Sequence, residues 1–582
     1  MGLNANLSGN EDTKLVLNNA NIKSSKIKLD QDASLVIGNT SGETISFTDA
    51  CEINATGGQS VTFTGNSDID FKGIFAGSGS TKGIVEMDNA TVIRTGADRG
   101  IEWNLNKGTL KYTDDRYLID NALVFNGGAL DLRNGAAYDI PLSALTINNN
   151  SKIYLDADLA NGKMDSFLNI GSSSVTGDYK IQVDGVTLLS DCEGDSVTIP
   201  FVRDSAIANA VEFTGDQGIY YSPIYRYFVD YDEDNGNFEF AKFNTNGAGG
   251  GKAVDAYNPA VLSASISQQG AYLAQLQAYD TAFANMDMLM IMPKEERQAL
   301  KYGNKYVSSD TENPITFSPI QTPEASKGIW FRPYTSFESV DMSGASVSNV
   351  NYGSLVGGDT GIIEHGKGWN GMYSAYVGYN GSHQNYKDVG IYQNGGLLGL
   401  SGIWYKNNFF TGLTANVGAS GATSHTMYGN EDFGMLSTGV ASKTGYNWEL
   451  ADGKFIIQPS YLMSYTFVNT FDYTNAAGVK IDASPLNTIQ IAPGIKLIGN
   501  LKNSWQPYIG VQMVWNVMDK TKIKANDVKL PEMSIDPYVQ YGLGLQKRVG
   551  NSFTGFGEAM FRGGGRNGAS FNFGFRWALG KK

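Results

Sequence analysis

Long apolar runs, histidines and cysteines are scarce in this chain of 582 residues. No stretch approaches the roughly 20 apolar residues that a membrane-spanning helix needs. The nearest candidate runs from Met286 to Met292 and is closed by Pro293. Only 18% of the residues are charged, which is compatible with residence in a membrane. Because only helices and closed barrels satisfy every backbone group in lipid, the chain is either a soluble protein or a membrane barrel.

Positive charge is outweighed by negative charge along the chain. There are 44 Lys and Arg residues against 58 Asp and Glu residues, so the formal net charge is −14. An acidic chain repels the phosphate backbone of nucleic acids. The composition therefore excludes nucleic acid as a partner.

The few cysteines and histidines limit the chemistry that the chain can perform. Cys51 and Cys192 are too few for a disulfide framework and lack metal-ligand spacing, so one long-range disulfide and two free thiols both stay open. The histidines are His365, His383 and His425, so the first 245 residues cannot hold a Ser–His–Asp triad. No phosphate-binding loop is present either. We therefore expect no enzyme, no cofactor and no metal site.

Three patterns keep an enzymatic alternative open. Gly194-Asp195-Ser196 resembles a nucleophile motif, but no base accompanies it. The many carboxylates allow a sugar-cleaving pair in the N-terminal part, although acidic turns are usually solvated surface. His383 and His425 lie near strand ends, with Asp388 and Asp432 close in sequence, as in proteases at a barrel rim. Loop histidines are more often ordinary loop residues.

What the chain has in abundance is period-two alternation from about Lys327 to the end. In the last segment an apolar face alternates with a small or polar face, and the apolar face consists of Ala569, Phe571, Phe573, Phe575, Trp577 and Leu579. A strand with lipid outside and water inside shows this pattern, with aromatic residues at both membrane interfaces. A soluble β-sandwich also alternates, but it does not need aromatic residues at both ends of such long strands.

Counting these segments predicts a twelve-stranded antiparallel barrel over residues 327–582. The predicted strands are 327–340, 352–364, 369–385, 391–406, 407–424, 433–450, 453–472, 486–501, 504–519, 533–549, 551–564 and 569–580. An even strand number places both ends of the barrel wall on the same side of the membrane.

A helix is predicted ahead of the barrel, over about residues 259–292 within a linker of residues 246–326. Asn258-Pro259 supplies an N-cap and a proline at the first helical position. Apolar residues follow at helical spacing, and the charged residues between Pro259 and Met292 are Asp280 and Asp287. At 1.5 Å per residue such a helix extends about 50 Å, enough to cross a bilayer inside a hydrated barrel. A surface helix or a dimerising helix is the alternative.

Residues 1–245 contain short strand-like pieces at close intervals, such as Ile45-Ser46-Phe47 and Val61-Thr62-Phe63. Turns rich in Gly and Asn separate them, as at Asn126-Gly127-Gly128. Stacked rungs of a parallel β-helix fit this pattern, since each rung buries its apolar face against its neighbours. A β-sandwich domain is the alternative.

The C-terminal part resembles the translocator domain of the type Va autotransporters of Gram-negative bacteria. The first strand contains Trp330, Arg332 and Pro333, similar to the opening of those barrels. The last strand resembles the signal that the outer-membrane assembly machinery reads, and its residues are Asn572, Gly574, Trp577 and Leu579. The segment from Leu155 through Asp165 to Val183 resembles the C-terminal rungs of pertactin-like passengers, where the family implies a structural role for Asp165.

This resemblance implies an outer-membrane protein that secretes and displays its own passenger. The implied partners are outer-membrane lipid, the barrel assembly machinery, periplasmic chaperones, and ligands on host or neighbouring cells if the passenger is an adhesin. A polysaccharide-degrading passenger, or a barrel that acts as a channel, are the alternatives. Since the N-terminal Met1-Gly2-Leu3 is no signal peptide, we expect a processed chain or a fragment.

Overall fold

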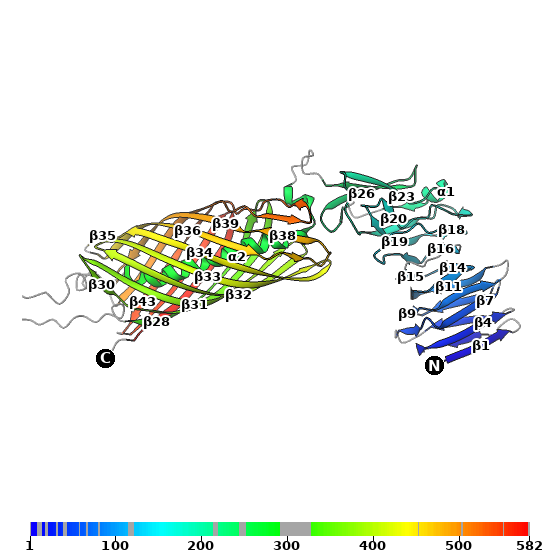
Figure 1. Ribbon diagram of the computed structural model, residues 1–582, viewed down its shortest axis with the longest axis horizontal. Coiled ribbons are helices and arrows are strands. Elements are labelled where there is room, and N and C mark those ends of the chain that lie inside the picture. Colours follow the sequence, from blue (N-terminus) through cyan, green and yellow to red (C-terminus); the bar gives the residue numbers. More distant parts are fainter. Residues whose placement is uncertain are drawn as a thin grey trace, which may run out of the picture. The chain divides into compact units, whose positions relative to one another are not determined.

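The computed structural model consists of two compact units, Met1–Gly251 and Lys252–Lys582. The structure describes residues 2–8, 14–17, 21–30, 33–38, 44–56, 59–65, 68–78, 82–113, 121–213, 219–243, 252–290, 327–451, 453–501, 504–550 and 552–579. The first unit runs from blue to cyan-green in Figure 1, and the second runs from green to red.

Three parallel sheets form most of the first unit. The first contains β1 (Gly2–Ser8), β4 (Ser24–Asp30), β7 (Cys51–Thr56), β10 (Ile74–Ser78) and β13 (Asp98–Arg99). The second contains β2 (Lys14–Leu17), β5 (Ser34–Gly38), β8 (Ser60–Thr64), β11 (Gly83–Asp88), β14 (Ile101–Leu105), β16 (Ala122–Asn126), β18 (Ala144–Asn149) and β21 (Ser173–Val175). The third contains β3 (Asn21–Ile22), β6 (Ile45–Phe47), β9 (Asp68–Phe71), β12 (Ala90–Arg94), β15 (Gly108–Tyr112), β17 (Ala129–Asp131), β19 (Ser151–Asp158), β22 (Ile181–Leu188) and β24 (Val211–Glu212), with β20 (Lys163–Met164) paired to β19.

The stacking of these strands confirms the predicted β-helix. Successive rungs place apolar side chains directly over one another, because parallel pairing aligns each inward position with the next. One buried ladder consists of Leu35, Val61, Val85, Trp103, Leu123 and Leu145. Burial of such ladders is the main stabilising contribution to stacked repeats.

The last part of this unit departs from the rung pattern. An antiparallel sheet contains β23 (Ser196–Pro200), β27 (Asn237–Lys242), β26 (Arg226–Asp232) and β25 (Ile219–Tyr221). A short helix, α1 (Ser205–Ala208), precedes β25, and the Asp204 carboxylate accepts hydrogen bonds from its first N–H groups. The sequence predicted rungs through residue 245, because short alternating strands look alike whether they pair parallel or antiparallel.

The second unit is a closed antiparallel barrel. Its wall contains β28 (Gly328–Met342), β29 (Ala345–Asp359), β31 (Trp369–Tyr386), β32 (Val389–Lys406), β33 (Phe409–Thr426), β34 (Gly429–Tyr446), β36 (Phe455–Thr470), β39 (Leu486–Gly499), β40 (Trp505–Val517), β43 (Tyr538–Val549), β44 (Phe553–Gly564) and β45 (Arg566–Ala578). The barrel closes where β28 pairs with β45, and β29 pairs with β31 beyond it. Within the described residues the wall therefore has the twelve strands that the sequence predicts.

Smaller strands extend the barrel at its two ends. At one end β30 (Ile363–Gly366) pairs with β31, and β35 (Trp448–Leu450) pairs with β36. At the other end, β37 (Tyr473–Thr474), β38 (Lys480–Ser484), β41 (Lys522–Ala525) and β42 (Val528–Lys529) form a separate antiparallel sheet. The sequence did not predict this sheet.

The outward face of the wall is apolar, as the alternation predicts. Trp577 is 53% exposed, while its neighbour Arg576 is 2% exposed and points into the barrel. The second strand is displaced from its predicted range of 352–364 and begins at Ala345. Ser343 and Gly344 form a tight turn with φ of 52° and 101°, which allows β29 to pair along the whole length of β28.

A long helix runs through the barrel (Figure 1). Two 3₁₀ turns, η2 (Ala253–Ala256) and η3 (Pro259–Leu262), lead into α2 (Ser263–Met290), and the Asn258 side chain caps the second turn as predicted. Residues 291 and 292 of the predicted helix lie outside the described residues. In the part of the chain that the structure describes, no helix has the length and apolar character needed to cross a membrane.

Candidate functional site

The barrel lumen is the candidate site, and α2 occupies it. From Ser263 to Met286 every side chain is buried except those of Asp280 and Ala284, which are half-buried. A helix on the surface would expose one face. The alternatives of a surface helix and of a helix outside the lumen are therefore wrong.

Polar side chains of α2 bond to the inner wall on several sides. Gln269 Nε2 donates to the Asp519 carbonyl at 2.6 Å, and Tyr272 Oη donates to Asn516 Oδ1 at 2.7 Å. On another side Gln275 Nε2 donates to Ser437 Oγ at 2.5 Å. The glutamines that the sequence places on the polar face thus replace water as partners of the wall.

The end of the lumen where α2 begins contains a large group of buried apolar residues. Buried residues from the strand ends and connections gather there, and they include Val340, Met342, Ala345, Val347, Val389, Ile391, Val468, Ile481, Ile523, Met533 and Ile535. Val261, Leu262 and Ile266 of the helix segment are buried at the same end. This end of the barrel is therefore packed like the core of a soluble protein.

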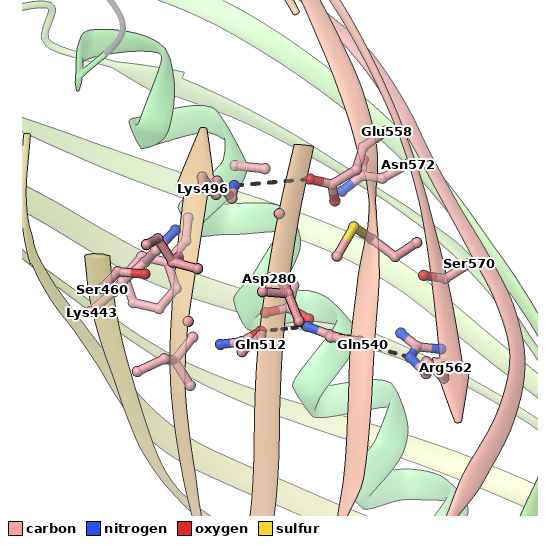
Figure 2. A pocket seen from close by; sticks show the side chains of 18 of the residues that line it. Asp280, Lys443, Ser460, Lys496, Gln512, Gln540, Glu558, Arg562, Ser570 and Asn572 are labelled. Carbon is pink, nitrogen blue, oxygen red and sulfur yellow. Dashed lines mark hydrogen bonds and ion pairs between the residues drawn. The ribbon is translucent and has the colours of Figure 1, made fainter. Parts of the chain in front are cut away.

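Farther along α2 the lumen becomes polar and contains a cavity of about 70 Å³ (Figure 2). Asp280 enters it from the helix, and Lys443, Lys496, Glu558 and Arg562 line it from the wall. Figure 2 shows Lys496 facing Glu558, with 4.0 Å between Nζ and Oε2. The cavity is large enough and polar enough to hold water. This part of the lumen thus contains more charge than the charge-poor helix led us to expect.

Buried ion pairs close the wall where its first and last strands meet. Glu338 of β28 accepts two hydrogen bonds from Arg566 of β45, at 2.7 and 2.8 Å, and one from Arg562 of β44 at 3.1 Å. Asp359 accepts two from Arg576, at 2.6 and 2.8 Å. The sequence did not predict these ion pairs, although charged residues at inward positions of lipid-facing strands are the signal that could have found them.

The two sequence motifs meet at this closure. Trp330 is buried and donates from Nε1 to Ser374 Oγ at 3.0 Å, and Pro333 is half-buried nearby. The Arg332 guanidinium lies 3.8 Å from the centre of the Phe556 ring and donates to the Ala284 carbonyl of α2 at 3.1 Å. A Cβ atom on Gly574 would lie 2.7 Å from Arg332 Cγ, so the last strand leaves room for this side chain.

The other residues of the last-strand motif divide between the two faces of the wall. Asn572 is buried inside the barrel and pairs with Tyr334 of β28. Trp577 and Leu579 are exposed outward, at 53% and 47%. The motif thus presents an apolar outer surface and a small or polar inner one.

Two histidines of the barrel-rim alternative contact Asn430 and Tyr392. His425 Nδ1 lies 2.6 Å from Asn430 Oδ1, and the His383 ring stacks on Tyr392. Asp432 accepts a hydrogen bond from Thr423 at 2.6 Å. In the first unit Cys51 and Cys192 are buried free thiols. Within the described residues no group of three potential metal ligands is present.

The first unit presents a rigid polar cluster on the outer face of its third sheet. Tyr154 Oη donates to Asp184 at 2.7 Å, and Lys152 Nζ donates to the same carboxylate at 3.0 Å. The Arg133 guanidinium lies 4.5 Å from the centre of the Tyr154 ring and bonds to Asp131 through two nitrogens. The hydrogen bond from Tyr154 lowers the pKa of Asp184, so this carboxylate is ionised at neutral pH. We call these five residues the Tyr154 cluster.

Inside the same rungs Asp165 is fully buried. Its carboxylate accepts from the N–H of Asp156 at 2.7 Å and from that of Tyr138 at 3.2 Å. Burial raises its pKa to about 8, and the nearby carboxylates of Asp156 and Asp131 add to the rise. The residue links three turns of the chain, which supports the structural role that the sequence implied.

Comparisons with known proteins agree with this architecture. Residues 329–559 match the family model described as the autotransporter beta-domain. Similar solved structures include the β domain of the Bordetella autotransporter BrkA, with 14% identity and a TM-score of 0.37, covering 44% of this chain and 100% of that one. The transport unit of AIDA-I from Escherichia coli has 14% identity and a TM-score of 0.39, covering 49% and 97%. The translocator domain of NalP from Neisseria meningitidis has 12% identity and a TM-score of 0.35, covering 52% and 98%.

A search of curated proteins gives no match. The family model is therefore the comparison that identifies the C-terminal unit, since the TM-scores to the solved structures are all below 0.5.

The closed wall and the helix in its lumen define an outer-membrane β-barrel that holds a segment of its own chain. Its C-terminal unit contains an autotransporter β-domain, which the family model matches over residues 329–559. The barrel is the translocator for secretion of the passenger that precedes it. It resides in the outer membrane, and the passenger is exposed at the cell surface, as in the family. The barrel end at Asn258, where the helix begins, is therefore the outer end.

Proposed function

We propose that the passenger is an adhesin and has no enzymatic activity. The observation that supports this most is the Tyr154 cluster, in which the half-buried Tyr154 and the exposed Arg133 are held in place by paired charges. Rigid Tyr and Arg side chains contribute much of the energy at protein interfaces. The sequence of the first 245 residues contains no histidine to act as a base. A preformed polar surface without such a base suits binding to a host or neighbouring cell.

Surface display of the full chain in a Gram-negative host tests this proposal. Cells that display the chain are expected to aggregate or to adhere to a matrix-coated surface. The double variant Arg133→Ala, Tyr154→Ala is expected to lose most of this adhesion at equal surface abundance. The control is Thr146→Ala on the outer face of the second sheet, which leaves the Tyr154 cluster intact and is expected to adhere normally.

The competing function is cleavage of polysaccharide by passenger carboxylates. The same displaying cells, incubated with a panel of acidic and neutral polysaccharides, are expected to release no new reducing ends. The adhesin proposal would be overturned if reducing ends are released and if replacing a passenger carboxylate stops their release.

We also propose that the barrel assembly machinery reads the last strand. Trp577→Ser is expected to lower the amount of folded barrel in the outer membrane several-fold. Trp515→Ser removes an outward tryptophan from an internal strand and is expected to have a smaller effect. Equal losses in the two variants would refute a special role for the last strand.

A further inference from the structure

The small sheet formed by β37, β38, β41 and β42 has two unlike faces. Its inner face consists of Ile481, Ile523 and Ala525, which are at most 3% exposed. The sheet is tied to the start of the helix segment, since Gln268 Nε2 donates to the Ser484 carbonyl at 3.0 Å and Tyr257 Oη donates to the Lys529 carbonyl at 3.4 Å. It therefore lies at the outer end of the barrel with one face fixed against the lumen.

The opposite face of this sheet presents lysines to the outside. Lys480, Lys522, Lys524 and Lys529 are exposed, and we call these four residues the lysine face. Asp482 lies among them, 3.8 Å from Lys480. Across the described residues the other three lysines form no recorded ion pair. The chain has a net charge of −14, so an excess of lysines on one surface is unusual for it.

The lysine face continues the lipid-facing surface of the barrel wall. Along β40 the outward residues Met513, Trp515 and Val517 are 48%, 36% and 45% exposed. At Met518, where φ is +64°, the side-chain alternation shifts by one residue. The exposed positions that follow are Lys520, Lys522 and Lys524. Lys520 pairs with Glu532 at 3.1 Å. The same outer surface thus changes from apolar to cationic just beyond the hydrocarbon-facing wall.

The pairing register places two like charges against each other. Lys524 lies directly opposite Lys529 on one neighbouring strand and opposite Asp482 on the other, and Ser484 lies opposite Lys522. Like charges at directly opposed positions destabilise a sheet. An anion bound between them would offset this repulsion, and a lysine ammonium is a common partner of phosphate in proteins.

We propose that the lysine face binds the phosphate groups of the anionic glycolipid that forms the outer leaflet of the membrane. The bound headgroups would hold the small sheet, and with it the outer end of the lumen, at the membrane surface. Basic clusters beside a membrane-spanning segment bind anionic lipid headgroups in this way. The inference depends on the outer-membrane position of the barrel and is independent of what the passenger binds.

Binding of fluorescent lipopolysaccharide to the full chain in neutral detergent tests the proposal. The variant Lys480→Gln, Lys522→Gln, Lys524→Gln, Lys529→Gln is expected to bind about tenfold more weakly or worse. The matched control replaces four lysines near the inner end of the barrel, Lys367→Gln, Lys406→Gln, Lys454→Gln, Lys547→Gln. It removes the same charge and is expected to stay within about twofold of the parent chain.

Further experiments distinguish the loss of charge from misfolding, and lipid binding from the binding of other anions. Replacing the same four lysines by arginine keeps the charge and is expected to keep the affinity. Dephosphorylated lipopolysaccharide is expected to bind the parent chain as weakly as the glutamine variant binds the native glycolipid. Equal affinity of the parent chain and the glutamine variant would overturn the proposal. Displacement by polyglutamate at equal charge would overturn it too, because the surface would then belong to an acidic polypeptide.

Discussion

Gly439 of β34 allows α2 to approach the barrel wall. A Cβ atom at this position would collide with Tyr279 Oη of the helix and would lie 2.5 Å from the Tyr465 carbonyl of the next strand. Gly439→Ala is therefore expected to destabilise the barrel by roughly 1–3 kcal/mol through overpacking. The temperature at which the heat-modifiable gel mobility is lost measures this effect.

A second glycine provides the control for this prediction. A Cβ atom on Gly421 would meet nothing within 4 Å. Gly421→Ala is expected to leave the transition temperature unchanged. A transition of Gly439→Ala at the parent temperature would mean that the helix does not fill the lumen at this position.

Asp165 makes the stability of the passenger depend on pH. Its pKa of about 8 in the folded state lies above the ordinary value of 3.8, so the folded state holds the proton more tightly. The resulting stability is complete below about pH 4 and is lost as the pH rises through about 8, with a total on the order of 5 kcal/mol. The urea concentration at which the passenger of the full chain loses protease resistance is expected to fall from pH 5 to pH 9.

Asp165→Asn tests the origin of this pH dependence. The asparagine is neutral at every pH and has nearly the same shape, so the variant is expected to lose much of the decline between pH 5 and pH 9. A decline as steep as that of the parent chain would assign the pH dependence to other groups.

Glu338 is the acidic partner of two buried arginines. Glu338→Gln removes the carboxylate to which Arg562 and Arg566 donate inside the wall, and breaking a buried pair costs about 3–5 kcal/mol. The urea midpoint for barrel unfolding is expected to fall accordingly. The exposed pair of Lys520 and Glu532 is the comparison, since Glu532→Gln is expected to cost at most about 1 kcal/mol. Equal losses would show that the closure of the barrel does not depend on burial of these charges.

At the scale of elements, the sequence predicted the strands that face lipid, because contact with lipid requires a regular alternation of residues. Where hydrocarbon covers one face and the lumen the other, apolar residues must alternate with small or polar ones. The prediction failed at the start of β29, where Ala345 and Val347 face inward and Ser346 and Ser348 face outward. Beyond the membrane, water contacts the outer face of the barrel wall and apolar residues lie on its inner face. The alternation of apolar and polar residues therefore inverts. The small lysine-bearing sheet was missed for the same reason.

The helix was predicted from its cap and its spacing, but its environment was only partly predictable. The structure buries its glutamines against the wall. Contacts such as Gln269 with the Asp519 carbonyl join positions 250 residues apart. A single sequence contains no signal for such pairs, and the same holds for Glu338 with Arg566.

Removing α2 is expected to open the barrel. In planar bilayers the full chain should conduct weakly, because every side of the helix is buried against the wall. A chain that lacks residues 259–290 should conduct several-fold more. An unchanged conductance would show that the helix is not what blocks the lumen.

At the scale of the whole molecule, we propose that folding of the passenger rungs drives secretion of the passenger through the barrel. No nucleotide-binding motif is present in the sequence, so burial and strand pairing outside the cell are the energy source that we propose for secretion. The rungs that come last along the chain would then matter most, since the earlier rungs stack on them.

Two substitutions in the passenger core compare these rungs. Leu155 and Leu35 are both fully buried, one in a late rung and one in an early rung. Leu155→Asp is expected to lower the displayed passenger per barrel several-fold, and Leu35→Asp by less. Antibody labelling of intact cells against total barrel measures the ratio. Equal display of the two variants would contradict the idea that the late rungs start folding.

The ion pairs between the first and last strands have a consequence for biogenesis. Glu338 and Arg566 are 228 residues apart, and nearly the whole wall separates them along the chain. A nascent protein truncated before Arg562 would keep the Glu338 carboxylate inside an incomplete ring without either of its arginine partners. Pairing of this carboxylate therefore requires the last two strands, so we expect only chains that reach them to close the barrel.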